Sequence, residues 1–296
     1  MNFRTDLALE RQEFISKKNV DGVETTTETK GNIKVTTIAV TNENGEREMG
    51  KPKGTYITLE TDSLMKNSSL IDCAADVLAP ELQKLLPKSG AVLVVGLGNE
   101  KITPDALGPK SISLMFATRH IGSELAKSVG LGTLRSVAAI APGVLGQTGI
   151  ETAEIIEAVA KRINPAAVVV IDALASRKLS RLGSTVQMSD TGISPGSGVG
   201  NRRVEISKKT LGIPVVAIGV PTVVDGATMA YDLLEEFGID PQSERRTPEM
   251  KNEGFMMVTP KEIDLLIERS AELIAMGINC AMQPDLSAKD LLALVK

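Results

Sequence analysis

The stretch AVLVVGLGNEKITPDALGPK, residues 91–110, begins with five apolar residues, passes through two glycines and then turns polar. An apolar run without alternation is typical of a strand that is buried on both faces of a parallel sheet. Three further runs of this kind follow along the chain, namely SVAAIA at 136–141, AAVVVI at 166–171 and PVVAIG at 214–219. We interpret these four runs as the strands of one mostly parallel sheet.

Segments with helical spacing lie between and after these runs. The pattern predicts helices over 69–86, 109–128, 149–165 and 259–282. Pro80 should break or bend the first helix, Pro109 suits the start of the second, and Thr259 with Glu262 predicts a capping box for the last. Strands that alternate with helices predict an α/β fold, with a mostly parallel central sheet flanked by helices.

The N-terminal part has a different character. Residues 1–30, which include the segment VETTTETKG, are polar and acidic, and we expect them to form a loosely held arm. Residues 32–60 contain two β-branched runs around an Asn- and Gly-rich segment, which predicts a β-hairpin or small meander. The sheet is therefore expected to carry a β-rich N-terminal extension at about 30–62.

Composition excludes several classes of protein. The chain of 296 residues has a formal net charge of −4 and only 2% aromatic residues, which argues against a nucleic-acid-binding surface. No apolar run reaches the roughly 18 residues that span a membrane. The N-terminus is charged where a signal peptide would be apolar, and the chain has only two cysteines. We expect a cytoplasmic protein that binds neither membrane nor nucleic acid.

Two aspartates follow or end predicted strands. Asp105 lies between Pro104 and the pair Gly108–Pro109, and Asp172 ends the run at 166–171. Each has a plain structural interpretation, as a helix N-terminal residue for Asp105 and as a hydrogen-bond anchor for Asp172. Open α/β sheets also place catalytic acids at strand ends. If the sheet brings the two together, one carboxyl can act as general base on water and the other as general acid.

Other chemistries fit the sequence less well. Gly96 and Gly98 begin a dinucleotide-binding loop, but Lys101 stands where its third glycine belongs, and no Walker motif is present. The single histidine, His120, is expected within a helix and has no nucleophile elbow to accompany it. A divalent metal held by Asp105, Asp172, His120 and Glu151 stays open. The glycine-rich segment 189–203 either clamps an extended substrate, with Arg202 and Arg203, or forms a surface loop.

Taken together, these motifs resemble those of the germination proteases of spore-forming Firmicutes. The resemblance rests on residues 94–110 and on APGVLGQTGIET at 141–152, VVVIDALASR at 168–177, SDTGISPGSGVGN at 189–201 and LGIPVVAIGVPTVVD at 211–225. It extends from RTDLALE at 4–10 to VTPKEID at 258–264 and so covers nearly the whole chain.

The resemblance implies an endopeptidase that degrades small acid-soluble spore proteins during germination in the spore core. It also implies a homotetramer without a cofactor, made as a zymogen that cleaves itself between Asp6 and Leu7. Residues 1–6 would then be a propeptide and residues 7–296 a single protease domain. The catalytic carboxylates of the family match Asp105 and Asp172. We expect a second group to shape the site or bind substrate: Gly96, Gly98, Asn99, Gly196, Gly198, Asn201 and Arg202.

Two alternative functions and one difference from the family accompany the resemblance. The fold of the family also resembles that of hydrogenase maturation endopeptidases, which bind metal, so a metal-dependent endopeptidase remains the alternative function. A nucleotide-binding module is less favoured, because the third glycine is missing. Residues 237–257 are shorter than the corresponding family segment, which leaves zymogen regulation and substrate approach open.

Overall fold

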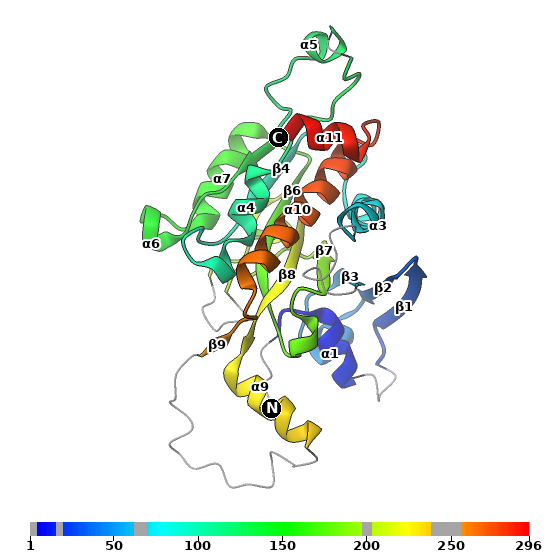
Figure 1. Cartoon of the computed structure of the whole chain (residues 1–296), viewed down its shortest axis with the longest axis vertical. Coiled ribbons are helices and arrows are strands. Elements are labelled where there is room, and N and C mark those ends of the chain that lie inside the picture. Colours follow the sequence, from blue (N-terminus) through cyan, green and yellow to red (C-terminus); the bar gives the residue numbers. More distant parts are fainter. Residues whose placement is uncertain are drawn as a thin grey trace.

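A computed structural model of the chain describes residues 5–15, 20–61, 70–128, 130–196, 203–237 and 256–295. Its centre is one nine-stranded sheet with the order β1-β2-β3-β7-β8-β6-β4-β5, and β9 pairs with β8 off this path (Figure 1). The strands are β1 (Val23–Lys30), β2 (Ile33–Val40), β3 (Gly54–Glu60), β4 (Val92–Gly96), β5 (Val137–Ile140), β6 (Ala167–Ser176), β7 (Thr185–Ser189), β8 (Val215–Asp225) and β9 (Met257–Val258).

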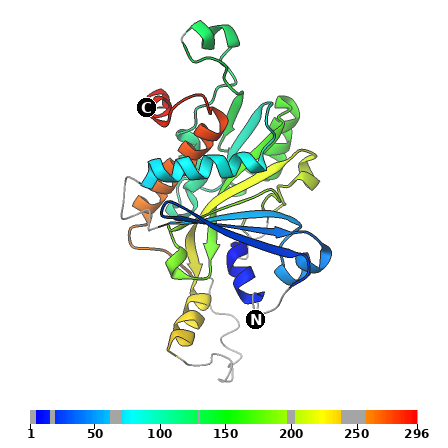
Figure 2. The ribbon, with the colours of Figure 1, turned by 90° about the vertical axis from the view of Figure 1, so that its right-hand side faces the viewer.

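The four runs that were predicted as buried strands form the parallel part of the sheet. Strands β5, β4, β6 and β8 are neighbours in parallel register. Alternate residues of β4 enter two separate cores, because successive side chains of a strand point to opposite faces. Val92 and Val94 pack in the core that contains α3, α4 and α10, whereas Leu93 and Val95 pack with Ile156 of α7. Helices thus cover both faces (Figure 2), and the predicted α/β class is confirmed.

The helices connect and cover these strands. The larger ones are α1 (Ala8–Ile15), α3 (Leu70–Leu85), α7 (Thr152–Ile163), α9 (Gly226–Glu236), α10 (Ile263–Met282) and α11 (Ala288–Val295). The shorter ones are α2 (Glu43–Met49), η1 (Thr103–Asp105), α4 (Leu107–Ser113), α5 (Ser123–Ser128), α6 (Leu145–Thr148), η2 (Leu179–Arg181) and α8 (Lys208–Leu211). None of the described helices is both long and apolar enough to cross a bilayer.

The N-terminal part is held more firmly than expected. The segment predicted to be a loose arm contains helix α1, whose Ala8 and Leu9 are buried against Ile38, Val40 and Tyr56. The Thr- and Glu-rich segment is the edge strand β1, where β-branched threonines suit an exposed strand. The Asn- and Gly-rich segment forms helix α2, since Asn42 caps it by accepting a hydrogen bond from the Gly45 N–H. β3 pairs antiparallel with β7, so the extension continues the central sheet.

Three predictions about helices were wrong in detail. The helix expected over 109–128 ends at Ser113, because the buried Asn279 of α10 binds the Phe116 N–H and the Leu114 carbonyl beyond it. His120 therefore lies in an exposed turn. Helix α3 runs through Pro80 without a break. Helix α10 begins at Ile263, after β9, and the capping box predicted for Thr259 and Glu262 is not formed.

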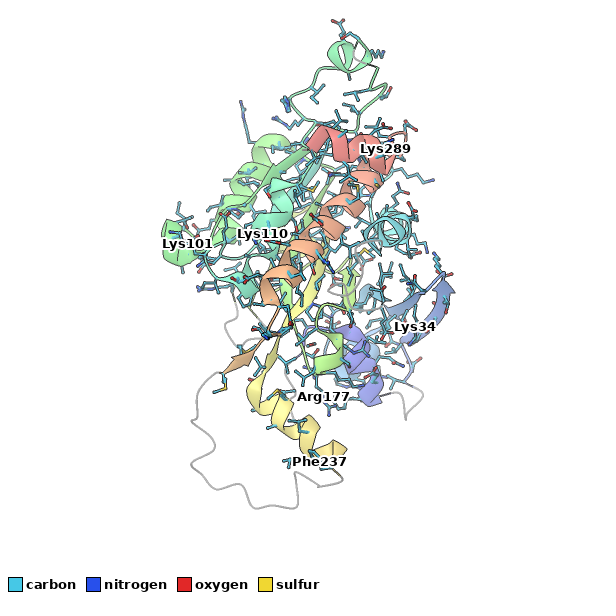
Figure 3. The ribbon with its side chains drawn as sticks, in the orientation of Figure 1. Lys34, Lys101, Lys110, Arg177, Phe237 and Lys289 are labelled. Carbon is cyan, nitrogen blue, oxygen red and sulfur yellow. The ribbon has the colours of Figure 1, made fainter. Side chains whose placement is uncertain are left out.

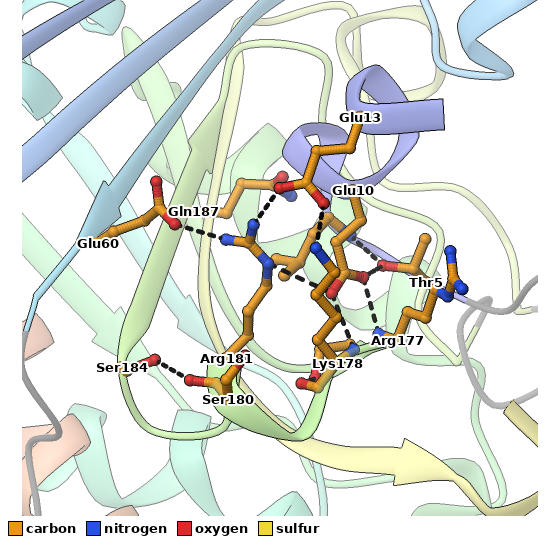
Figure 4. A network of polar contacts seen from close by, with 12 residues as sticks. Thr5, Glu10, Glu13, Glu60, Arg177, Lys178, Ser180, Arg181, Ser184 and Gln187 are labelled. Carbon is orange, nitrogen blue, oxygen red and sulfur yellow. Dashed lines mark hydrogen bonds and ion pairs between the residues drawn. The ribbon is translucent and has the colours of Figure 1, made fainter. Parts of the chain in front are cut away.

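A network of charged groups joins α1 to the turn that follows β6 (Figure 4). Glu10 is 1% exposed, and its carboxylate accepts hydrogen bonds from the N–H groups of Arg177 (2.7 Å) and Lys178 (3.0 Å). The Arg181 guanidinium lies 3.4 Å from the same carboxylate and also pairs with Glu13 and Glu60. Because each buried charge has partners, the network can fix α1 without leaving an uncompensated ion.

Replacing Glu10 by Ala should lower the free energy of unfolding by about 3 kcal/mol, since the buried donors of this network lose their shared acceptor. Urea unfolding, followed by circular dichroism, measures the change. The matched control is Glu24→Ala on the exposed edge strand β1, which should change stability by less than about 0.5 kcal/mol. Equal losses in both variants would show that the network does not anchor α1.

Candidate active site at the carboxyl end of β4

The site begins where β4 ends beside β6. Gly96, the last residue of β4, pairs with Ile171, and the Leu97 N–H donates to the Ile171 carbonyl at 2.8 Å. The next residue of β6 is Asp172. Asp172 was predicted to end its own strand, but β6 continues to Ser176, so the strand that ends there is the neighbouring β4. The loop that leaves β4 consequently starts next to the Asp172 side chain.

This loop returns to place Asp105 at its far end. The Asp105 carboxylate accepts a hydrogen bond of 2.8 Å from the Asn99 N–H, so it is directed back toward the start of the loop. Thr222 of β8 donates its hydroxyl to the Pro104 carbonyl at 2.8 Å and ties the short helix η1 to the sheet. The carboxylate therefore has a defined direction, as its position between Pro104 and Gly108 suggested.

Two glycines make the tight turn sterically feasible. Gly98 has a φ of +109°, and a Cβ atom there would lie 2.0 Å from the Asp105 carbonyl oxygen. A Cβ atom on Gly96 would lie 2.3 Å from the Gly108 carbonyl oxygen, at the start of α4. Both positions thus require glycine, Gly98 for its backbone conformation and Gly96 for the close approach of α4. The catalytic importance that we expect of these glycines stays a prediction.

Burial raises the pKa of both carboxyls, and the charge of Asp105 adds to the shift of Asp172. Asp172 is 6% exposed, and burial raises its pKa well above the usual range, helped by the nearby charges of Asp105 and Asp6 and partly opposed by the Ala173 N–H. Burial also raises the pKa of Asp105, while the Asn99 N–H acts in the opposite direction. Two adjacent carboxyls with raised pKa values, in different environments, are the arrangement that general acid–base catalysis uses.

The two aspartates line a cavity of about 430 Å³. Among the predicted residues, Gly98 and Gly196 also line it. Glu151 lines it as well and pairs with Arg203 at 3.7 Å. Three other predicted site residues, Gly198, Asn201 and Arg202, lie outside the described residues. Most of residues 237–257 lie outside them as well.

The N-terminal segment enters the same cavity through Asp6. The Asp6 N–H donates to the Ala175 carbonyl at 2.9 Å, and the Asp6 carboxylate accepts from the Ala175 N–H at 2.9 Å. Leu7 is fully buried. The segment predicted to contain a self-cleavage bond thus lies along β6, three residues beyond Asp172.

The metal site left open by the sequence is not assembled as proposed. The Arg119 N–H, next to His120, donates a hydrogen bond to the carbonyl of Val137, the first residue of β5. His120 thus lies at the amino ends of the parallel strands, whereas Asp105 and the end of β4 lie at their carboxyl ends. Within the described ranges, no three His, Cys, Asp or Glu side chains lie close enough together to hold a metal ion. His120 therefore does not join Asp105 and Asp172, and the donor set present does not fit a three-ligand metal centre.

The dinucleotide interpretation gains no support from the loop. Lys101 is exposed and lies beside α6 (Figure 3), where Gln147 donates to the Asn99 side chain at 2.8 Å. Lys101 stands where the third glycine of such a loop belongs, and this glycine is the residue that lets helix and strand approach closely.

Sequence reasoning missed two residues that contact Asp6. Lys51 Nζ and Gln187 Nε2 both donate to the Asp6 carbonyl oxygen, at 2.8 Å and 3.0 Å. Lys51 comes from the polar linker between α2 and β3, and Gln187 is the central residue of β7, whose sequence is TVQMS. Neither belongs to a motif with recognisable spacing, so only the folded chain brings them to the same atom.

Comparison with known proteins identifies the family. The family model described as germination protease matches residues 4–252. The chain belongs to the germination protease family. It is 46% identical to the germination protease of Caldanaerobacter subterraneus subsp. tengcongensis, over 98% of this chain and 97% of that protein. It is 45% identical to the one of Clostridium tetani (98% of each) and 38% identical to the one of Bacillus velezensis (96% and 94%).

A solved structure also matches. The [NiFe] hydrogenase maturation protease HycI from Thermococcus kodakarensis aligns with a TM-score of 0.36 and 19% sequence identity, covering 67% of this chain and 98% of HycI. Membership of the germination protease family rests on the sequence matches, which make this chain a protease.

The requirement for glycine at position 98 in this germination protease is testable. Gly98→Ala should lower the free energy of unfolding by more than about 2 kcal/mol, because the new Cβ atom adds a backbone clash to an unfavourable φ. Gly132→Ala is the control, since Gly132 has a φ of +66° but open space around it, and it should cost about 1 kcal/mol. Urea unfolding measures both, and equal costs would contradict the steric argument.

Asp172→Asn should stabilise the folded protein at alkaline pH. Because the pKa of Asp172 is raised in the folded state, stability is lost as the pH rises from the unfolded to the folded pKa; the full cost is present above the folded pKa and none below the unfolded one. The variant should therefore melt at a higher temperature than wild type at pH 8, and the difference should shrink toward pH 4. Calorimetry across this range tests the sign, with the exposed Asp285→Asn as control. A variant that is less stable at pH 8 would contradict it.

Proposed function

We propose that this protein is an endopeptidase that begins the degradation of small acid-soluble spore proteins during germination. In this proposal it is made as a zymogen and removes residues 1–6 by cleaving its own Asp6–Leu7 bond. Asp105 and Asp172 activate the attacking water and protonate the leaving group. The protein acts in the spore core as a homotetramer and needs no cofactor.

One observation carries the proposal, namely that Asp6 lines the same cavity as Asp105 and Asp172. A protease that cleaves itself must bring a peptide bond of its own chain to its catalytic groups, and the bond expected from the family resemblance begins at this residue. The Asp6 main chain and side chain both bond to Ala175 of β6. Extended substrates bind to sheet edges through such main-chain contacts, so the segment supports a substrate-like role.

The environments of the two carboxyls favour one division of roles. The Asp105 carboxylate receives a hydrogen bond from Asn99, which stabilises its charged form, so Asp105 serves as general base. Asp172 is more deeply buried, its pKa is raised well above the usual range, and it serves as the protonated general acid.

The reaction then proceeds in two proton transfers. Asp105 takes a proton from water as the water oxygen attacks the carbonyl carbon of the scissile peptide bond. Asp172 gives its proton to the peptide nitrogen, and the carbon–nitrogen bond of the tetrahedral intermediate breaks. The products are a new carboxyl terminus and a new amino terminus. A proton then returns from Asp105 to Asp172, through solvent, and restores the pair.

Self-association into a homotetramer is proposed from the family resemblance. Exposed apolar side chains at the end of α9 support it, among them Phe237, which is 78% exposed and lies at the end of α9 that is remote from the sheet (Figure 3). Apolar groups gathered on a projecting helix are typical of surfaces that pack against a partner.

Substituting either carboxyl should slow proteolysis strongly. Asp105→Asn and Asp172→Asn should each reduce the rate at least about 100-fold, since proton transfer by a positioned group contributes that much or more. The purified full-length variants are incubated alone and with an α/β-type small acid-soluble spore protein. Mass spectrometry then reads the Asp6–Leu7 cleavage and the substrate fragments.

Two comparisons make the experiment decisive. The control Asp285→Asn, an exposed aspartate far from the cavity, should cleave at the wild-type rate. Chelator should leave wild-type cleavage unchanged. Cleavage that persists in both site variants would overturn the assignment of Asp105 and Asp172, and loss of activity with chelator, restored by one added metal ion, would favour the metal-dependent alternative.

A further inference from the structure

Two donors converge on one main-chain oxygen of the N-terminal segment. Lys51 Nζ lies 2.8 Å and Gln187 Nε2 lies 3.0 Å from the carbonyl oxygen of Asp6. This is the carbonyl of the Asp6–Leu7 peptide bond. A peptide carbonyl in a loop ordinarily needs one donor, and here it receives two from distant parts of the chain. One of the two is an ammonium group, so the contact supplies charge as well as hydrogen bonds.

Gln187 lies within a strand, and Lys51 lies just beyond the end of helix α2. Gln187 is 8% exposed and lies in β7, where it pairs with Gly219 of β8. Its side-chain oxygen accepts a hydrogen bond of 2.6 Å from the Ala8 N–H. The Gln187 amide therefore binds the main chain on both sides of Leu7, at the Asp6 carbonyl and at the Ala8 N–H. Lys51 follows Gly50, which closes helix α2 with a φ of +61°. Neither donor has to move to reach the oxygen.

The two donors and the two carboxylates line different cavities that share Asp6. Asp6 lines the cavity of Asp105 and Asp172, and it also lines a second cavity of about 770 Å³ together with Lys51, Gln187 and Gly219. Asp6 thus borders both sets of groups. The carboxyls of Asp105 and Asp172 can transfer protons. Lys51 and Gln187 can stabilise negative charge on the carbonyl oxygen.

The charge on Lys51 is suited to a transient anion. Burial lowers the pKa of its amine, with Arg11 acting in the same direction, while the carboxylates of Asp6 and Glu10 favour the cation. An ammonium surrounded by protein interacts more strongly with a charge that develops beside it than one in water does.

We propose that Lys51 Nζ and Gln187 Nε2 form the oxyanion hole for cleavage of the Asp6–Leu7 bond, an inference that rests on the self-cleavage proposed above. When water attacks the Asp6 carbonyl carbon, the electron pair of the C=O double bond moves to the oxygen, and these two groups stabilise the negative charge. The same groups receive the corresponding carbonyl of a substrate protein. Lys51 and Gln187 thereby become catalytic residues in addition to Asp105 and Asp172.

The test measures the first-order rate of Asp6–Leu7 cleavage in the full-length protein by intact-mass spectrometry. Lys51→Met removes the ammonium group but keeps an unbranched side chain. Gln187→Glu keeps the shape and the acceptor for the Ala8 N–H, and it places a carboxylate oxygen where the donor was. Each should slow cleavage about 100- to 1,000-fold. Lys51→Arg restores a cationic donor and should recover part of the rate.

Matched controls separate catalysis from folding. Lys53→Met changes an exposed lysine of the same linker and should cleave within about twofold of wild type. Melting temperatures are measured for every variant. If Lys51→Met does not fold, Gln187→Glu and Lys51→Arg carry the test.

The outcomes distinguish this inference from the function on which it rests. Wild-type cleavage together with cleavage within about threefold of that rate in Lys51→Met or Gln187→Glu would overturn the oxyanion hole alone. Failure of the wild-type protein to cleave Asp6–Leu7, or undiminished cleavage by Asp105→Asn, would overturn the proposed self-cleavage and the oxyanion hole with it. Loss in both variants, with partial recovery by Lys51→Arg, supports the inference.

Discussion

The parallel register between β4 and β6 is the constraint on which the rest of the structure depends. Because Gly96 pairs with Ile171, β4 ends beside the residue that precedes Asp172. The loop from β4 therefore has to turn back at once, which requires the positive φ of Gly98, and the turn brings Asp105 to the buried aspartate. If the register of β6 against β4 shifted by one residue, the Asp172 side chain would point to the other face of the sheet, since side chains alternate along a strand.

This arrangement costs stability locally, and other contacts offset the cost. Two carboxyls of the same sign share one cavity, and burial penalises the ionised form of each. The two apolar cores on either side of the sheet and the network around Glu10 hold the fold in spite of this. Glu10 lies on the C-terminal side of the Asp6–Leu7 bond, so its network would continue to anchor α1 after the cleavage that we propose.

The sequence predicts the parallel core and the two aspartates because both follow from local patterns. Short apolar runs bounded by Gly and Pro favour buried strands, and polar residues at the carboxyl ends of parallel strands lie at one end of the sheet. Other features depend on distant partners. Asn279 of α10 binds the backbone just beyond the end of α4, and β3 joins the extension to the central sheet by pairing with β7. Lys51 and Gln187 come together because both donate to the Asp6 carbonyl. No pattern within a short window of sequence reveals such contacts.

The pairing of Asp105 with Asp172 is the central claim, and a carbon-13 NMR titration of the aspartate carboxyls tests it most directly. We expect Asp172 to titrate well above the ordinary aspartate value of about 3.9 and to move downward in Asp105→Asn, because the variant removes the neighbouring charge. Two independent titrations near the ordinary value, unchanged by the substitution, would contradict the account.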